Sequence, residues 1–211
     1  MRNFKKTLSF LLSTVIIVSS VAGVGTTVFA ATDEHTYKNF KYRILDDNTA
    51  EICGYTGKNA VVTVPDSIDS KPVTSIGRTA FYSGKIKEVT IPNTVRSIKW
   101  WAFYGCESLE KINLNFGLKT VGYGAFMNCK KLKSVSIPMS VTQICDDSFA
   151  VSCSTQKGVF DTYSKQTIST QQYSTDSLFT LEGYSGTVAE KYCNDNSLNF
   201  VSLGNVIYGD V

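Results

Sequence analysis

Side chains that could perform acid–base or nucleophilic chemistry are few in this chain. His35 is the only histidine, and it lies in a polar segment, residues 31–38, that we expect to be loosely held. A Ser-His-Asp or Cys-His arrangement needs a base that the scaffold holds rigidly. The sequence also contains no glycine-rich phosphate loop, His-Glu-x-x-His motif or spaced acidic calcium loop. We therefore expect no enzyme, no metal site and no cofactor.

Two pairs of adjacent carboxylates are the remaining catalytic candidates. Asp46 and Asp47 belong to an Asp-Asp-Asn-Thr cluster, which is typical of a hairpin connection in which neighbouring side chains point apart. Asp146 and Asp147 open a segment that we expect to be a short helical turn, where acids favour exposed amides. A hydrolase that uses carboxylates alone stays open at this point, although nothing in the sequence favours one.

The chain has six cysteines. Cys106 and Cys129 occupy equivalent positions of a repeat, and Cys193 falls on a predicted helix, so we expect three buried thiols; side chains stacked in adjacent coils rarely present the S–S torsion of a disulfide. Cys145 and Cys153 are the one pair whose local loop could close on itself, and they are the candidate disulfide. No Cys-x-x-Cys motif supports a zinc site.

The elements that must position these residues come from a sequence motif that is repeated between residues 73 and 149. Its copies start 22, 23 and 23 residues apart. A period of this length with fixed apolar positions is typical of a solenoid. The four copies, the last more divergent, are Val73–Phe81, Val95–Phe103, Leu118–Phe126 and Val141–Phe149.

Each copy predicts one strand and one turn. Pairs of apolar residues that alternate around a polar one indicate a strand, and they are Val89/Ile91, Ile112/Leu114 and Val135/Ile137. An Ala-Phe pair within each full copy indicates a short helical turn that places one small and one large side chain inward. One coil cannot bury both apolar sets alone, so we expect neighbouring coils to stack.

The pattern Val-x-x-Ile-Gly-x-x-Ala-Phe-x-x-Cys-x-x-Leu-x-x-Val-x-Ile-Pro resembles the BspA-type leucine-rich repeat of bacterial surface proteins. The resemblance covers residues 73–149 and extends to the flanks at Tyr42 and Gly183. It differs in three places: one residue is missing between Phe81 and Ile86, Asn115-Phe-Gly stands where Pro is usual, and an insertion follows Phe149. The resemblance implies an α/β repeat solenoid, a right-handed leucine-rich-repeat superhelix with short strands and short helical turns. It also implies host or bacterial surface proteins as partners.

The N-terminal residues predict where the protein is located. Basic residues precede an apolar run from Leu8 to about Ala22, and Val28-Phe-Ala30 has small residues where a signal peptidase cleaves. We expect residues 1–30 to be an export signal, which makes the protein secreted or cell-surface; an uncleaved anchor is the alternative. No later apolar stretch approaches the roughly 20 residues that span a bilayer.

The rest, residues 31–211, is expected to form one leucine-rich-repeat domain. Residues 31–72 would be a β-rich N-terminal cap, residues 73–181 the repeats, and residues 182–211 a helical C-terminal cap that starts at a capping box, Thr187-Val-Ala-Glu190. The insertion, residues 152–177, has 15 Ser, Thr or Gln among 26 residues. It is either a binding protrusion or a partly ordered loop.

Two surfaces are candidates for binding. Repeat positions place aromatic and arginine side chains, which are enriched at interface cores, in two adjacent columns, although the rings could equally just cover the core. This candidate ligand patch comprises Arg78, Trp100 and Tyr123, with Tyr82 and Tyr104.

The second surface is electrostatic. The 30-residue signal accounts for the whole excess of 21 basic over 18 acidic residues, and residues 73–140 hold 10 basic and 3 acidic ones. This candidate basic patch, which comprises Lys85, Lys87, Lys111, Lys131 and Lys133, could hold an anionic glycan or wall polymer, or it could be a solvated face. The aromatic interleaving of single-strand binders is missing, so we expect no nucleic acid.

These patterns together predict a monomeric, non-enzymatic binding module for protein–protein recognition or adhesion. An anionic-glycan binder and a purely structural surface component are the alternatives.

Overall fold

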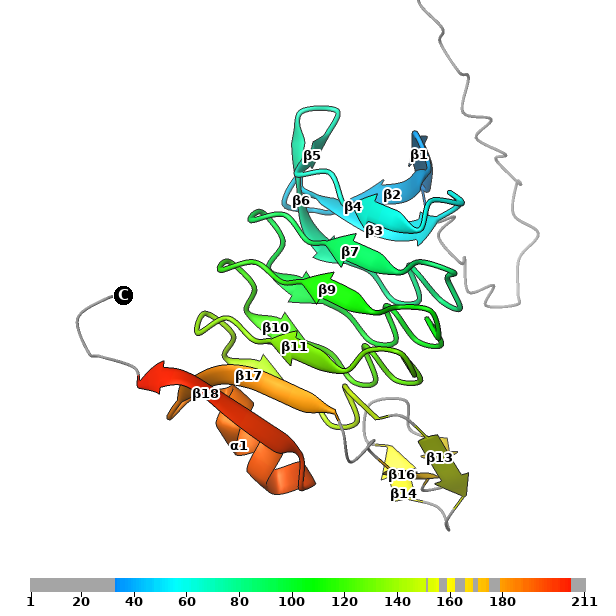
Figure 1. The fold of residues 1–211 in the computed structure, drawn as a ribbon. Helices are drawn as coiled ribbons and strands as arrows, with labels where there is room; N and C mark the ends of the chain where they lie inside the picture. Colours follow the sequence, from blue (N-terminus) through cyan, green and yellow to red (C-terminus); the bar gives the residue numbers. More distant parts are fainter. Residues whose placement is uncertain are drawn as a thin grey trace, which may run out of the picture. The chain divides into compact units, whose positions relative to one another are not determined.

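The computed structural model describes residues 33–150 and 179–205, and the backbone of four strands between them. In this part of the chain, short parallel strands run along two sides of a stack of coils (Figure 1). The predicted export signal, residues 1–30, lies outside the described residues. None of the described helices is long and apolar enough to cross a membrane.

Parallel pairing in fixed register builds the first side of the stack. Ile76 pairs with Ile98, Ile98 with Val121, and Val121 with Ile144. Each of these apolar residues points to the interior because it alternates with a polar residue along its strand. The strands of this side, in order, are β3 (Ala50–Tyr55), β6 (Lys71–Ile76), β8 (Ser97–Ile98), β10 (Thr120–Val121) and β12 (Gln143–Ile144).

The second side also consists of parallel strands, in two ladders. Val62 pairs with Val89 and Val89 with Ile112 in the first ladder, and Val135 pairs with Leu181 in the second. These strands confirm the predicted alternating segments. They are β4 (Val61–Thr63), β7 (Glu88–Thr90) and β9 (Lys111–Asn113), then β11 (Ser134–Ser136), β17 (Thr180–Ser185) and β18 (Asn199–Asn205).

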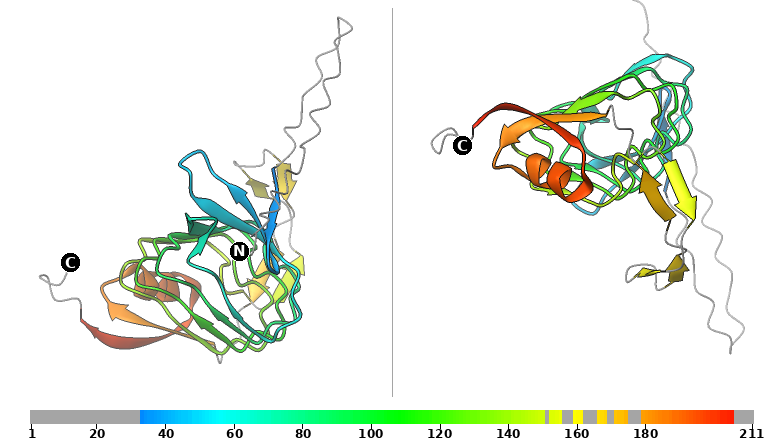
Figure 2. Two further views of the ribbon diagram at one scale, coloured as in Figure 1. Left: turned by 90° about the horizontal axis from the view of Figure 1, so that it is seen from above. Right: turned by 60° about the horizontal axis from the view of Figure 1, so that its bottom comes forward.

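The solenoid class is confirmed, and the stack is longer than the four predicted coils. The strands β3 and β4, expected in an N-terminal cap, pair in parallel with β6 and β7, so they form a coil of their own. At the other end α1 (Val188–Asn196) and β18 close the stack, which has about six turns (Figure 2). Before the first coil, β1 (His35–Tyr37) and β2 (Phe40–Ile44) add antiparallel strands to β3. After β4, β5 (Ser67–Ile68) folds back on β6.

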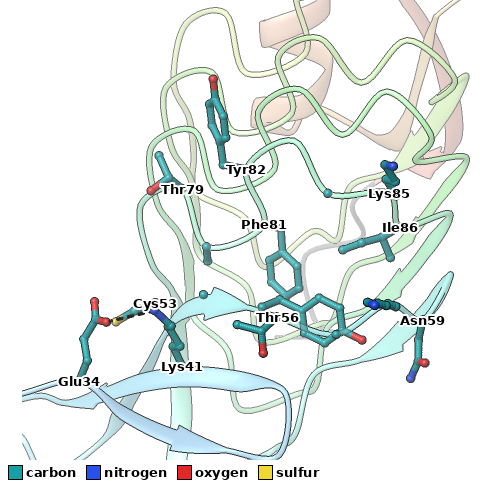
Figure 3. Close-up of a pocket in the computed structure, with 16 residues that line it drawn as sticks. Glu34, Lys41, Cys53, Thr56, Asn59, Thr79, Phe81, Tyr82, Lys85 and Ile86 are labelled. Atoms are coloured by element: carbon teal, nitrogen blue, oxygen red, sulfur yellow. Dashed lines mark ion pairs between the residues drawn. The ribbon is translucent and has the colours of Figure 1, made fainter.

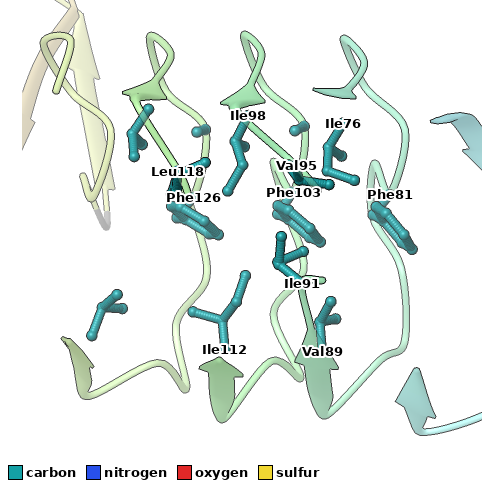
Figure 4. Packing of buried hydrophobic residues seen from close by; sticks show 14 of the residues in the cluster. Ile76, Phe81, Val89, Ile91, Val95, Ile98, Phe103, Ile112, Leu118 and Phe126 are labelled. Atoms are coloured by element: carbon teal, nitrogen blue, oxygen red, sulfur yellow. The ribbon is translucent and has the colours of Figure 1, made fainter. Parts of the chain in front are cut away.

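A column of aromatic rings fills the interior. Phe81, Phe103 and Phe126 lie one above another between the two aliphatic rows (Figure 4). Their centroids are 4.8 and 5.2 Å apart, and their planes differ by 9° and 8°. Phe149 and Phe179 continue the column, and Tyr55 begins it 5.6 Å from Phe81. Equivalent residues therefore stack, as the period predicts.

The segments that carry these phenylalanines are turns, so the expected helical turns are wrong in this detail. The residue before each inward Ala or Ser has a left-handed backbone, with φ between 55° and 57°, and these residues are Thr79, Trp101, Gly124 and Asp147. Along the turn, alternate N–H groups bond to the next coil: Phe81 N–H donates to Ala102 O at 2.8 Å. A helix would keep those donors for itself, so bonding between coils excludes it.

One helix closes the stack as predicted. It starts after the N-cap Thr187 and ends at Asn196. The capping box is altered, because Glu190 accepts a hydrogen bond from the N–H of Gly186 at 2.7 Å rather than from that of Thr187. Tyr192 packs edge-on against Phe149, 6.0 Å between centroids, and burial raises the pKa of its hydroxyl.

A buried carboxylate joins the first coils to the N-terminal hairpin. Glu51 in β3 is 1% exposed and accepts hydrogen bonds from Arg43 at 2.5 Å and from Ser75 at 2.7 Å. It also forms an ion pair with Lys99. Burial raises the pKa of Glu51, but the hydrogen bonds from Lys99 and Ser75 outweigh burial, and the pKa lies below its usual value.

The insertion contains two antiparallel strand pairs. Cys153 pairs with Tyr173 in one, and Phe160 with Thr167 in the other. Only the backbone of these strands is described, so the predicted role of residues 152–177 in binding stays a prediction. The strands are β13 (Ser152–Thr155), β14 (Val159–Asp161), β15 (Gln166–Ile168) and β16 (Gln171–Ser174).

Candidate functional site

The catalytic candidates lie in an edge strand and in turns. His35 is exposed in β1, and its Nε2 lies 3.7 Å from the exposed carboxylate of Asp33. Asp47 accepts hydrogen bonds from the N–H and hydroxyl of Thr49 at 3.0 and 2.6 Å, which is the geometry of the β2–β3 turn. Within the described residues there is no cluster of three or more His, Cys, Asp or Glu that could hold a metal ion.

The cysteines follow the packing of the coils. Cys106 and Cys129 are buried free thiols in neighbouring coils, and Cys193 is a buried free thiol on α1, as predicted. Cys145 is half-buried. The side chain of Cys153 lies outside the described residues, so the disulfide stays a prediction.

Strand register brings the candidate ligand patch together. Because Ile76 and Ile98 are paired and Ile98 is paired with Val121, the residues two positions later also lie in one column. This column contains Arg78, Trp100 and Tyr123. Arg78 is exposed, and the side chain of Trp100 is 37% exposed. We call this surface, with Tyr82 and Tyr104, the aromatic face.

Trp101 links the coils of the aromatic face, a role that the sequence analysis missed. The Arg78 guanidinium lies over its ring, 4.8 Å from the centroid, and the Tyr123 ring meets it edge-on at 6.2 Å. Space for the indole comes from Gly124, since a Cβ there would lie 2.7 Å from the ring. The Trp-Trp doublet beside a glycine in the next copy is the signal that could have identified this contact.

The second column of the aromatic face is a stacked tyrosine pair. The rings of Tyr82 and Tyr104 are 5.4 Å apart and differ by 8° in orientation, and Tyr82 is 57% exposed. Asn128 donates its side-chain N–H to the Tyr104 hydroxyl at 3.2 Å. The column ends at Met127, which is buried. The tyrosine rings are therefore held in fixed orientation on the surface.

The aromatic face is cationic at one end and acidic at the other. Arg78 begins the first column, and Asp146 continues it beyond Tyr123, with Asp147 one position later. Asp147 lies in a turn, which corrects the expected helix start. Burial and the neighbouring Asp146 raise the pKa of Asp147, and a hydrogen bond from Tyr123 opposes them.

Ion pairs partly neutralise the candidate basic patch. Lys111 lies 3.3 Å from Glu88, and Lys131 lies 3.7 Å from Glu110. Exposed pairs of this kind contribute little to stability, but they lower the local charge. The other members, Lys85, Lys87 and Lys133, are exposed on their coils. The lysines are thus interleaved with glutamates instead of forming one uniform positive surface.

A rigid array of rings suits binding better than catalysis. Rings held in register by strand pairing lose little freedom when a partner covers them, which lowers the cost of association. Tyrosine, tryptophan and arginine side chains offer flat, amphipathic contact surfaces.

Comparisons with known proteins agree with this geometry. The family model for the BspA type leucine rich repeat region matches six copies over residues 64–200. No curated protein matches the chain.

Solved structures of leucine-rich repeat proteins are similar to this chain. One from Bacteroides capillosus is 31% identical, with 54% of this chain and 88% of that chain covered and a TM-score of 0.52. One from Bacteroides ovatus is 24% identical, with 81% and 43% covered and a TM-score of 0.53. A leucine rich cell surface protein from Faecalibacterium prausnitzii is 25% identical, with 73% and 46% covered and a TM-score of 0.48. The chain spans less than half the length of the last two.

Proposed function

Because the chain belongs to the BspA-type leucine-rich repeat family, we propose that it is a binding module whose aromatic face recognises a partner protein. The observation that supports this proposal most is the Arg78–Trp101–Tyr123 contact series beside the stacked Tyr82–Tyr104 pair. Centres of protein interfaces are rich in these side chains. The scaffold alone indicates no partner.

The partner that we propose is a protein at a host or bacterial cell surface, and the module acts there in recognition or adhesion. The export signal predicted at residues 1–30 supports this location. We assign the module no catalytic step and no cofactor, and we propose that it acts as a monomer.

Capture from extracts tests the proposal. The mature chain, residues 31–211, is immobilised and exposed to extracts of bacterial walls and of host cell surfaces. We expect saturable capture of a protein by the wild type and loss of capture by the Trp100→Ala/Tyr123→Ala variant. Phe116→Ala is the matched control, since Phe116 is 74% exposed and lies outside the aromatic face. Unaltered capture by the double variant would refute the aromatic face as the binding site.

Two alternatives give different results in the same assay. A binder of an anionic glycan through the basic patch would lose affinity steeply as salt rises and would be sensitive to Lys87→Glu. The ion pairs of Lys111 and Lys131 weaken support for this alternative. A purely structural surface component would capture nothing saturably.

A further inference from the structure

A pocket of about 330 Å³ lies between the first and second coils, at the end of the buried aromatic column, where Tyr55 and Phe81 line it (Figure 3). One wall comes from residues 53–59, the end of β3 and the loop that leads to β4. The other wall comes from residues 79–86, the turn of the second coil. Of the aromatic face, only Tyr82 also borders this pocket.

The pocket exists because the first coil is short. Three fewer residues connect Ile52 to Val62 than connect the paired residues Ile76 and Val89 of the second coil. The first coil therefore has no counterpart of the turn that carries Phe81. Tyr55 supplies only a ring that packs against Phe81, and it folds closely over Gly57, where a Cβ would lie 2.2 Å from its hydroxyl.

Backbone carbonyls at this turn have donors in every later coil. Ala102 O accepts the N–H of Phe81, and Tyr104 O accepts that of Ser83, both at 2.8 Å. One coil further, the equivalent carbonyls accept in the same way at 2.8 and 2.9 Å, from Phe103 N to Ala125 O and from Gly105 N to Met127 O.

In the second coil the two equivalent carbonyls belong to residues that line the pocket. These residues are Ala80 and Tyr82, and no N–H of the described residues donates to Ala80 O or Tyr82 O. In each later coil the donors are alternate N–H groups of a turn, which has a left-handed residue two positions before and two positions after its phenylalanine. The donors that Ala80 O and Tyr82 O lack would therefore be alternate N–H groups of a second chain segment in a similar turn. Ala80 is 3% exposed, and a buried carbonyl favours a donor over an empty site.

The charges around the pocket indicate the side chains of the occupant. Lys58 and Lys85 line it, and neither has a carboxylate of the described residues within ion-pair distance. Lys41, the third lysine of the lining, lies 3.9 Å from Glu34. Within the described residues, the pocket thus presents two cations without an ion pair beside two carbonyls without a donor.

We propose that this pocket binds an acidic peptide segment of a partner protein in a turn conformation. Alternate N–H groups of the peptide donate to Ala80 O and Tyr82 O, as those of Phe81 and Ser83 donate to Ala102 O and Tyr104 O of the next coil. The carboxylates of the peptide lie against Lys58 and Lys85. The site goes beyond the aromatic face and uses different chemistry.

A defined probe tests the site: a pentapeptide of alternating Thr and Asp with acetyl and amide ends. Titrated into the mature chain labelled with ¹³C and ¹⁵N, it should shift the carbonyl carbons of Ala80 and Tyr82 saturably. N-methylation of the amides in one alternating phase should weaken binding about tenfold or more, because it removes both hydrogen bonds. Methylation in the other phase should preserve binding. Equal effects of both phases would overturn the proposal.

Charge reversal at Lys85 is the second test of the site. Lys85→Glu should weaken peptide binding by about tenfold, whereas Lys87→Glu, two residues away and outside the pocket, should leave it nearly unchanged. Equal affinities of the two variants for the peptide would contradict the proposal. So would a result in which chitooligosaccharide, but not the peptide, shifts the carbonyl carbons of Ala80 and Tyr82 saturably. The Trp100→Ala/Tyr123→Ala variant should bind the peptide normally, so failure of this site and failure of the aromatic face are separable.

Discussion

The guanidinium of Arg78 lies 4.8 Å from the centre of the Trp101 ring, although the two residues belong to successive coils. Strand pairing brings them together, because Ser75 is paired with Ser97 and Ile76 with Ile98. A cation over an indole face contributes about 0.5–1 kcal/mol at an exposed site. The contact therefore orients two surface side chains more than it stabilises the fold.

Removal of one ring from the interior column should destabilise the whole stack. Phe103 lies between Phe81 and Phe126 and is 0% exposed. Phe103→Ala should lower the free energy of unfolding by about 3–5 kcal/mol, measured by urea denaturation. Phe116→Ala, at an exposed site, should change it by less than about 0.5 kcal/mol. Similar losses for both variants would contradict the ring column as the core.

Glycine at position 124 should be needed for the position of Trp101. Gly124 has φ +57°, and a Cβ would lie 2.7 Å from the indole. Gly124→Ala should cost about 1–2 kcal/mol for the left-handed backbone and should also displace Trp101, which its fluorescence would report. Gly186→Ala is the control, because Gly186 has φ +82° and nothing within 4 Å of a Cβ. If the two variants have the same fluorescence, Trp101 does not depend on Gly124.

Acid should weaken the junction between the N-terminal hairpin and the first coils. The pKa of Glu51 is lower in the folded protein than its usual value, so its contribution to stability is present above about pH 4.3, the unfolded pKa. It is lost as the pH falls through the folded pKa. Glu51→Gln should lower stability at pH 7 by about 1–3 kcal/mol and flatten its dependence on pH below about 4. If the melting temperature of Glu51→Gln falls with pH below about 4 as steeply as that of the wild type, Glu51 is not the cause of the acid sensitivity.

Asp147, unlike Glu51, should destabilise the folded protein when its carboxylate is charged. Burial raises its pKa in the folded state, so the charged form is disfavoured there, and this destabilisation decreases as the pH falls through the folded pKa. Asp147→Asn should therefore raise the melting temperature at pH 7, and Asn also tolerates the left-handed backbone at this position, φ 55°. Asp146→Asn serves as the exposed neighbour control. A lower melting temperature for Asp147→Asn would show that the carboxylate is needed by Tyr123.

The sequence predicted the stacking better than it predicted the surfaces. A repeat period is a one-dimensional signal, and the column of Phe81, Phe103 and Phe126 follows from it directly. The period did not identify Glu51, whose partners lie on three other segments, nor Trp101, whose contacts depend on a left-handed turn. The pocket could not be predicted either, because it arises where the repeat is incomplete. Contacts between segments that do not share the repeat period become visible only in the three-dimensional structure.

The turns were misassigned for a definable reason. An Ala-Phe pair with one inward small residue and one inward ring fits a helical turn and a β-turn equally well in sequence. Only the hydrogen bonds between coils, such as Phe81 N–H to Ala102 O, decide between them. Donors committed to the next coil cannot also close a helical turn.

The affinity of the mature chain for the partner that it captures tests the central claim most directly. Titration calorimetry should show that Trp100→Ala/Tyr123→Ala weakens binding by about tenfold or more, since truncation of central aromatic residues has effects of this size. Phe116→Ala should bind as the wild type does, and all three proteins should melt at nearly the same temperature. Equal dissociation constants for the double variant and the wild type would contradict the aromatic face as the recognition surface.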